Sequence, residues 1–393
     1  MKRTALVVVV LVWVAWLALP WLTSSRRAID AAPYVASAAF LPDHVEDVYP
    51  RDDGSNAPGF TAQACATYPD DDPCPAVAGF ASAPPVLLAT WPLRWLEPDD
   101  AISAVRLVTV ATLLIPAFLL WRRLAVDEQG ARIAAVTMLA LTPSAVVVVA
   151  LGQTSPLLMV LPFLAAESGR RKETVAGAVV GGLALLKVLP GGLVLAAAWQ
   201  RRWRLVAAAV AVAVIPAAIA AVVLGRAAYT DWLHGLANHG ALVARSPGNG
   251  SLEGLLSGVG RNPDAAWVLR AVLVVVLLRA LAAVAHPGRA WVLATVALLV
   301  VSPQLWTHYL LAAVAAVAAL AVGRERWAVA GAAAVCSIVN WLRGWLVIDS
   351  TAIRAATWLL PVAVFVWGFR RSRASAAARP EPIRPSAGRP GSG

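Results

Sequence analysis

The sequence predicts an all-α polytopic membrane protein with about 12 transmembrane helices and a large extracytoplasmic loop after the first. Composition is the first reason. Of 393 residues, 60% are hydrophobic and 14% are charged, whereas soluble domains have about 45–50% apolar and about 25% charged residues. The other two reasons are the spacing of apolar runs and the placement of Lys and Arg. Because basic membrane loops explain the net charge of +11, no nucleic-acid partner is expected.

The first apolar run, residues 5–22, follows Lys2 and Arg3. It is long for the apolar part of a signal peptide, and no small-residue cleavage site stands before Arg26 and Arg27. We therefore expect an uncleaved anchor whose N-terminus is cytoplasmic.

Eleven further apolar runs complete a prediction of twelve spans. They cover residues 101–121, 133–151, 155–168, 174–188, 190–200, 205–225, 264–285, 290–305, 308–322, 327–342 and 355–369.

The basic residues alternate between the two predicted sides. Of 33 Lys and Arg residues, 20 fall in short inner turns and the tail, nine fall in longer outer loops, and four (Arg106, Lys187, Arg270 and Arg279) fall within spans. This pattern predicts a multi-pass plasma-membrane protein with both termini cytoplasmic. The transmembrane domain covers residues 1–369, with outer loops at about 23–100 and 226–263, and a basic tail at 370–393 is expected to be disordered.

Two features of the first outer loop carry their own predictions. Phe80 to Leu96 is apolar but contains three prolines and Arg94, so we expect an interfacial or re-entrant segment rather than a span. Cys65 and Cys74 are close enough in sequence to form one disulfide if the loop faces an oxidising compartment.

Polar residues that interrupt the apolar pattern gather on the predicted outer side. Each has a structural explanation of its own. Gln153 can satisfy backbone groups at a helix break, Lys187 can reach the interface, His308 can bond a carbonyl, and Asn249 and Ser251 can be turn residues. Together, carboxylate, histidine, lysine and amide groups at the helix ends suit a lipid-phosphate substrate.

Five short elements follow one another along the chain. They are Asp30, Tyr34, Ala36 to Ala39, Asp47 and Tyr49; then Phe80, Pro84, Pro85, Trp91, Pro92 and Leu93; then Gly152-Gln153, with Lys187 and Pro190; then Gly248 to Leu255; and finally Ser302, Pro303, Trp306 and His308.

In this order the elements resemble glycosyltransferase family 87, membrane enzymes of the C superfamily that use polyprenyl-phosphate sugars, often polyprenyl-phosphate mannose. Ala83-Pro84-Pro85 stands where the family has Tyr-Pro-Pro, and the loop between Asp47 and Phe80 is longer and more acidic than the family pattern.

The resemblance implies a GT-C-like fold and an inverting hexosyltransferase, with mannose as the expected sugar. Its partners would be a polyprenyl-phosphate sugar donor, a lipid-linked glycan acceptor and membrane lipid. Asp30 is the expected base, with Asp47 as second choice, and His308 would contact the leaving phosphate or the acceptor. Other expected substrate-binding residues are Tyr34, Asp47, Gln153, Lys187, Arg245, Asn249, Ser251 and Trp306. No metal and no cofactor is expected.

Other functions remain open at this point. A twelve-span secondary transporter would carry polar groups near the bilayer midplane and show two-half symmetry. A lipid flippase or a noncatalytic scaffold for envelope assembly is a third possibility.

Overall fold

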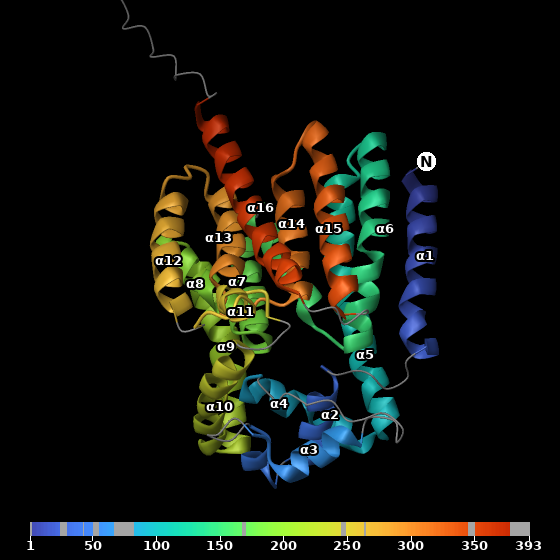
Figure 1. The fold of residues 1–393 in the computed structure, drawn as a ribbon, viewed down its shortest axis with the longest axis vertical. Helices are drawn as coiled ribbons and strands as arrows, with labels where there is room; N and C mark the ends of the chain where they lie inside the picture. The colour runs from blue at the N-terminus through green and yellow to red at the C-terminus, as the bar shows by residue number, and fades with distance from the viewer. Residues whose placement is uncertain are drawn as a thin grey trace, which may run out of the picture.

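The computed structural model describes residues 2–23, 30–41, 43–49, 55–66, 82–166, 170–244, 249–262, 265–344 and 350–377. These residues form helices and turns, without a strand. The helices divide into a bundle and a smaller group at one end of it, which we call the cap (Figure 1).

The bundle contains twelve of the α-helices and short 3₁₀ segments. Its members are α1 (Lys2–Thr23), α5 (Pro98–Leu124), α6 (Glu128–Leu151), η3 (Ser155–Ala166), α7 (Arg170–Leu186), η4 (Leu189–Gly191), α8 (Gly192–Trp199), α9 (Trp203–Leu224), α11 (Leu252–Gly258), α12 (Ala266–Ala282), α13 (Pro287–Val301), η6 (Thr307–Tyr309), α14 (Leu310–Leu320), η7 (Gly323–Arg326), α15 (Trp327–Gly344) and α16 (Thr351–Ala377).

Helix α14 forms the centre of the bundle. Nearly all its side chains are buried, and they are mostly alanine, valine and leucine. A helix that is apolar all round needs neighbours on every side, and α14 packs against η3, α13, α15, α16 and α5. The small alanine side chains let these neighbours approach closely.

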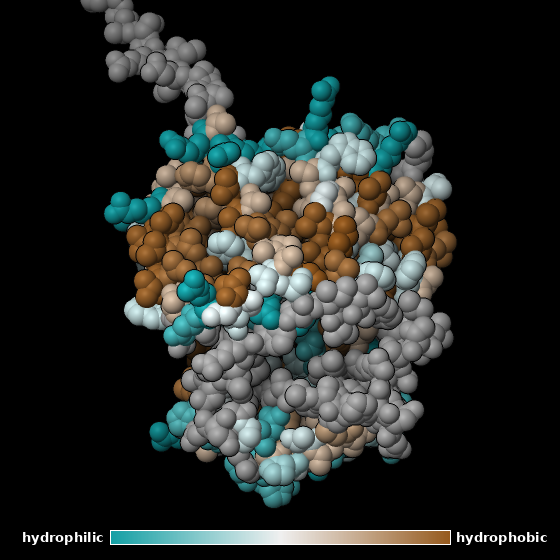
Figure 2. All heavy atoms as spheres, viewed as in Figure 1, coloured by the Kyte–Doolittle hydropathy of each residue, from teal (hydrophilic) through white to brown (hydrophobic). Residues whose placement is uncertain are grey.

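The periphery of the bundle exposes apolar side chains. Helix α1 is held to α6 by a hydrogen bond from Trp13 Nε1 to Met138 O, 3.0 Å long, yet Val7, Leu11 and Val14 are more than half exposed. Figure 2 shows an apolar band across the viewed face of the bundle, with hydrophilic side chains beyond one edge. Such a band is the surface that a bilayer covers.

The predicted spans coincide with helices, but the helices differ in length. Among the described residues, four helices are long and apolar enough to cross a membrane: Pro98–Leu124, Glu128–Leu151, Trp203–Leu224 and the Thr351–Ala374 part of α16. Others are shorter. The run at 155–168 forms the 3₁₀ helix η3, which contains two prolines that donate no backbone hydrogen bond. The structure therefore supports a multi-pass membrane protein.

The described parts of the two predicted outer loops form helices. The cap consists of α2 (Ala32–Ala39), η1 (Val45–Asp47), α3 (Pro58–Cys65), α4 (Pro84–Thr90), η2 (Trp91–Trp95) and α10 (Ala227–Ala244). These elements share a hydrophobic core that includes Leu41, Tyr49, Phe60 and Leu87. The core explains why short, proline-initiated helices form here, since isolated helices of this length are unstable.

The expected interfacial segment belongs to the cap. Its described part forms α4 and η2, which pack on α2, while α4 also packs on α9. Phe80 lies outside the described residues. Cys65 is disulfide-bonded, and its expected partner Cys74 also lies outside them.

The opposite end of the bundle is rich in arginine. Arg326 bridges Asp127, with 2.7 Å between Nη2 and Oδ2, and so joins the start of α15 to the turn before α6. One expectation fails at this end. The tail was predicted to lack structure from Arg370, but α16 continues to Ala377 because Arg, Ala and Ser extend the helix without a break.

Helices α7 and α9 pack with an unusually close backbone approach. Gly177 and Gly181 lie one turn apart on α7, and a Cβ at either position would overlap a backbone oxygen of α9, that of Leu205 or of Ala209. Small residues at this spacing are typical of membrane helix interfaces.

We therefore expect Gly181→Ala to lower stability by about 1–3 kcal/mol, because the added methyl must push α9 away. Thermal unfolding in detergent measures the effect. Gly331→Ala on α15 is the control, since its Cβ would meet nothing within 4 Å. An equal effect of both variants would contradict the packing argument.

Candidate functional site

The site is built at the end of α6 that lies beside the cap, where the chain turns back into the bundle through η3. The backbone N–H of Asp30 donates to Leu151 O, 3.1 Å away, at the carboxyl end of α6. Gly152 then ends the helix with φ of 75°. A Cβ on Gly152 would lie 2.7 Å from the Ala31 Cβ. Glycine is therefore required twice, by the left-handed backbone and by the close approach of the Asp30 turn.

Gln153 connects this turn to the Asp30 side chain. The Ser155 hydroxyl donates to Gln153 Oε1 over 3.0 Å, which leaves the amide nitrogen to donate to the Asp30 carboxyl. Burial raises the pKa of that carboxyl above its ordinary value, while the Gln153 hydrogen bond and the charge of Lys187 act in the opposite direction. Asp30 is thus a weaker acid than an exposed aspartate and a correspondingly stronger base.

The Lys187 side chain reaches toward the Asp30 carboxyl from the end of α7. It follows Leu186, where the helix breaks before Pro190. Its ammonium group interacts with Asp30, Tyr34 and Tyr309, and lies 5.9 Å from the centre of the Tyr309 ring. The lysine is therefore not simply extended toward a membrane surface.

His308 completes the group from the segment between α13 and α14. Its ring stacks on Trp306, with centroids 6.4 Å apart and planes inclined by 11°, and meets Tyr309 edge-on at 4.9 Å. The side chain is 6% exposed, its Nε2 has no hydrogen-bond partner, and the Lys187 charge acts on it. A buried ring nitrogen without a partner is costly unless a ligand or water occupies the space beside it.

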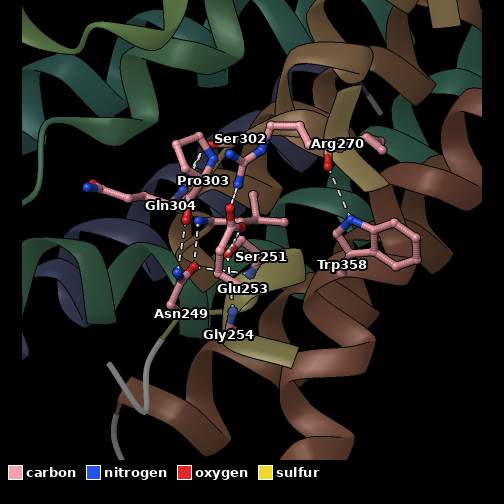
Figure 3. Close-up of polar contacts among 11 residues, drawn as sticks. Asn249, Ser251, Glu253, Gly254, Arg270, Ser302, Pro303, Gln304 and Trp358 are labelled. Carbon is pink, nitrogen blue, oxygen red and sulfur yellow. Dashed lines mark hydrogen bonds and ion pairs between the residues drawn. The ribbon is translucent and has the colours of Figure 1, made fainter. Parts of the chain in front are cut away.

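A second network holds the His308 segment in place (Figure 3). Asn249 is fully buried and donates from Nδ2 to Pro303 O over 2.9 Å. Its Oδ1 accepts from the backbone N–H groups of Leu305 and Ser251, each at 3.0 Å. Gly250 N adds a bond of 2.8 Å to Leu305 O. The Asn249 side chain thus supplies hydrogen bonds to backbone groups of this loop. Without them, these buried backbone groups would lack partners, because the loop has no regular secondary structure.

Ser251 and its neighbours extend the network. Ser251 caps α11 by accepting from Gly254 N and donates to Glu253 Oε2 over 3.1 Å. Glu253 in turn pairs with Arg270 of α12. The buried carboxylate is therefore neutralised by a span arginine, and α11 is fixed against α12.

The remaining expected residues fall in different places. Tyr34 lies on α2, and its hydroxyl is 3.5 Å from the Ser82 hydroxyl. Asp47 belongs to η1 and forms a separate group with His44 and Glu46, whose ligand atoms all lie within 4.8 Å of one another. Arg245 lies outside the described residues.

Two residues were not singled out from the sequence. Arg106 of α5 is 1% exposed and donates from Nη2 to Ala150 O over 3.5 Å, beside the Asp30 anchor. Asn340 of α15 is fully buried and donates to Thr307 O over 3.1 Å, so it supports the His308 segment. Both lie inside predicted apolar spans, where any polar residue is a functional signal.

The fold and the site define a polytopic membrane protein whose ionisable groups gather at one end of its helices. The chain belongs to glycosyltransferase family 87, whose profile matches residues 80–303, more than half of the sequence. It is therefore a membrane glycosyltransferase, and such enzymes require a sugar donor and an acceptor. Gln153, Lys187, Asn249 and Ser251 lie within the match, whereas Asp30 and His308 lie outside it. No curated protein and no solved structure matches the chain.

We expect Asn249→Ala to destabilise the protein by about 1–3 kcal/mol for each buried backbone group left unpaired, with a lowered melting temperature in detergent. Gln304→Ala is the matched control in the same loop, because the Gln304 side chain points away from the network in Figure 3 and its hydrogen bonds with the Ser302 hydroxyl use backbone atoms. Equal melting temperatures for the two variants would contradict this role.

Proposed function

We propose that this glycosyltransferase transfers a hexose, with mannose as the proposed sugar, from a polyprenyl-phosphate carrier to an envelope glycolipid or polysaccharide on the outer face of the plasma membrane. The single observation that carries the proposal is the convergence of Asp30, Lys187 and His308 from three distant segments. A base and cationic or hydrogen-bonding groups in one place are what transfer from a sugar phosphate requires.

In the proposed reaction Asp30 acts as the base. Its carboxylate accepts the proton of the acceptor hydroxyl while the hydroxyl oxygen forms a bond to the anomeric carbon. The bond from that carbon to the phosphate oxygen breaks, and polyprenyl phosphate leaves with the electron pair. One displacement inverts the anomeric configuration. The raised pKa of Asp30 favours proton acceptance from a weakly acidic alcohol.

The leaving phosphate is assigned to Lys187 and His308. The lysine supplies positive charge for the phosphate, whose single negative charge becomes two as the bond to the anomeric carbon breaks. The unpartnered Nε2 of His308 provides a polar contact for the phosphate or the acceptor, and Trp306, stacked on the histidine, provides an apolar face for a sugar or prenyl group.

The other expected residues take supporting roles in the proposal. Tyr34 is assigned to binding the acceptor, because Tyr34 and the proposed base Asp30 both interact with the Lys187 ammonium group. Gln153 orients the base, and Asn249 and Ser251 act as positioning residues through the His308 segment rather than by touching substrate. Asp47 and Arg245 remain proposed binding residues.

The membrane arrangement of the proposal has twelve spans with both termini cytoplasmic. It is supported by the arginine-rich end of the bundle lying opposite the cap, as the positive-inside rule requires when the cap is extracytoplasmic. In that orientation the Asp30 site opens at the outer leaflet, where a lipid-linked sugar can reach it.

We expect Asp30→Asn to lower transfer by about 10²–10⁴-fold, because the amide cannot accept the acceptor proton. Purified protein is incubated with polyprenyl-phosphate mannose and an envelope glycolipid extract, and mass analysis scores a one-hexose gain. Asp43→Asn, at an exposed position of the same cap segment, should retain transfer. Near-normal turnover by Asp30→Asn would eliminate Asp30 as the base.

The proposal also predicts a pH effect. The base form of Asp30 exists above its pKa, so activity falls as pH decreases through that value. Gln153→Leu removes a hydrogen bond that lowers the Asp30 pKa, so the acid limb of the kcat/KM profile should move to higher pH. Thr154→Val is the control, since the Thr154 hydroxyl makes no hydrogen bond. An unmoved acid limb in Gln153→Leu would show that Asp30 is not the titrating base.

A further inference from the structure

A groove of about 810 Å³ lies at the arginine-rich end of the bundle, beside the C-terminal half of α16. The Asp30 site lies at the other end of the bundle. Its lining residues come from α16 between Ala363 and Ala374, together with Glu325 of η7. This groove has no part in the transfer mechanism proposed above.

The rim of the groove is strongly cationic. Arg371 pairs with Glu325, and its guanidinium lies 5.7 Å from the centre of the Trp367 ring. The adjacent Arg370 is exposed and lines the same groove.

Two more arginines add to this charge from neighbouring helices. Arg289 of α13 and Arg123 of α5 both act electrostatically on Arg371. Arg123 is fixed by donating to Ala318 O and Ala319 O, at 3.3 and 3.0 Å. Because Glu325 is the acidic residue that lines the groove, the local positive charge exceeds the negative charge.

The lower part of the groove is apolar. Ala363 and Val366 face it, and Val366 is 41% exposed. Figure 2 places hydrophilic side chains beyond the apolar band at this end of the bundle. The groove therefore combines a cationic rim with an apolar floor at the level where a lipid headgroup meets its acyl chains.

We propose that this groove binds an anionic glycerophospholipid of the surrounding leaflet. The lipid phosphate lies against Arg370 and Arg371, while the upper part of an acyl chain follows Val366 and Ala363. Charge complementarity selects this occupant: the excess of guanidinium groups favours a phosphate without a compensating choline or ethanolamine. Glu325 then competes with the lipid for Arg371.

The test uses the full-length protein in nanodiscs of phosphatidylcholine with a minor fraction of phosphatidylglycerol, and native mass spectrometry counts the phosphatidylglycerol retained. Arg370→Gln should lower its affinity about fivefold, the effect of one basic residue near an anionic lipid. Glu325→Gln should raise the affinity by a similar factor, because it removes the competing carboxylate. Arg373→Gln, an exposed position of α16 outside the groove lining, should leave it unchanged.

Three outcomes would overturn the proposal. The first is equal retention in the wild type, Arg370→Gln and Glu325→Gln proteins. The second is displacement of the retained lipid by millimolar inorganic phosphate, which would assign the groove to free phosphate. The third is preferential retention of polyprenyl phosphate over phosphatidylglycerol. All these experiments measure lipid retention. Their outcome therefore does not depend on whether the protein shows sugar transfer.

Discussion

The site depends on the close approach of the Asp30 turn to the carboxyl end of α6. Gly152 permits that approach, because a side chain there would collide with Ala31. The same turn brings Gln153 to the Asp30 carboxyl. The position of the Asp30 carboxylate is therefore set mainly by backbone contacts. These contacts also hold the Asp30 turn, which precedes the cap helix α2, against the end of the bundle.

A carboxyl and an ammonium group beside an apolar bundle would be costly if each stood alone. In this protein the two groups lie together, and each interacts with more than one partner. Asp30 has the Gln153 amide and Lys187, whereas Lys187 also has the oxygens of Tyr34 and Tyr309. Two polar groups differ from these: the Nε2 of His308 and the hydroxyl of Thr154, next to Gln153, are buried without a hydrogen-bond partner. We propose that a substrate contacts the site at the buried ring nitrogen of His308.

Much of the site was predictable because each polar residue interrupts an apolar run at the same predicted membrane side. Gln153, Lys187 and His308 were all found in this way, and the family assignment is confirmed. The roles of Asn249 and Ser251 were not predictable, since a sequence does not show that an amide spans two loops. The ordered cap was also missed. Its helices are short and rich in small residues, and they acquire stability from the shared core around Phe60 and Leu87.

The central claim is that the donor phosphate lies between Lys187 and His308 with the anomeric carbon facing Asp30. A structure of the enzyme in nanodiscs with a nonreactive polyprenyl-phosphonate sugar tests it most directly. The account predicts the phosphonate oxygens within hydrogen-bond distance of Lys187 Nζ and His308 Nε2, and the sugar between them and the Asp30 carboxyl. A bound donor analogue that contacts neither Lys187 nor His308 would contradict it.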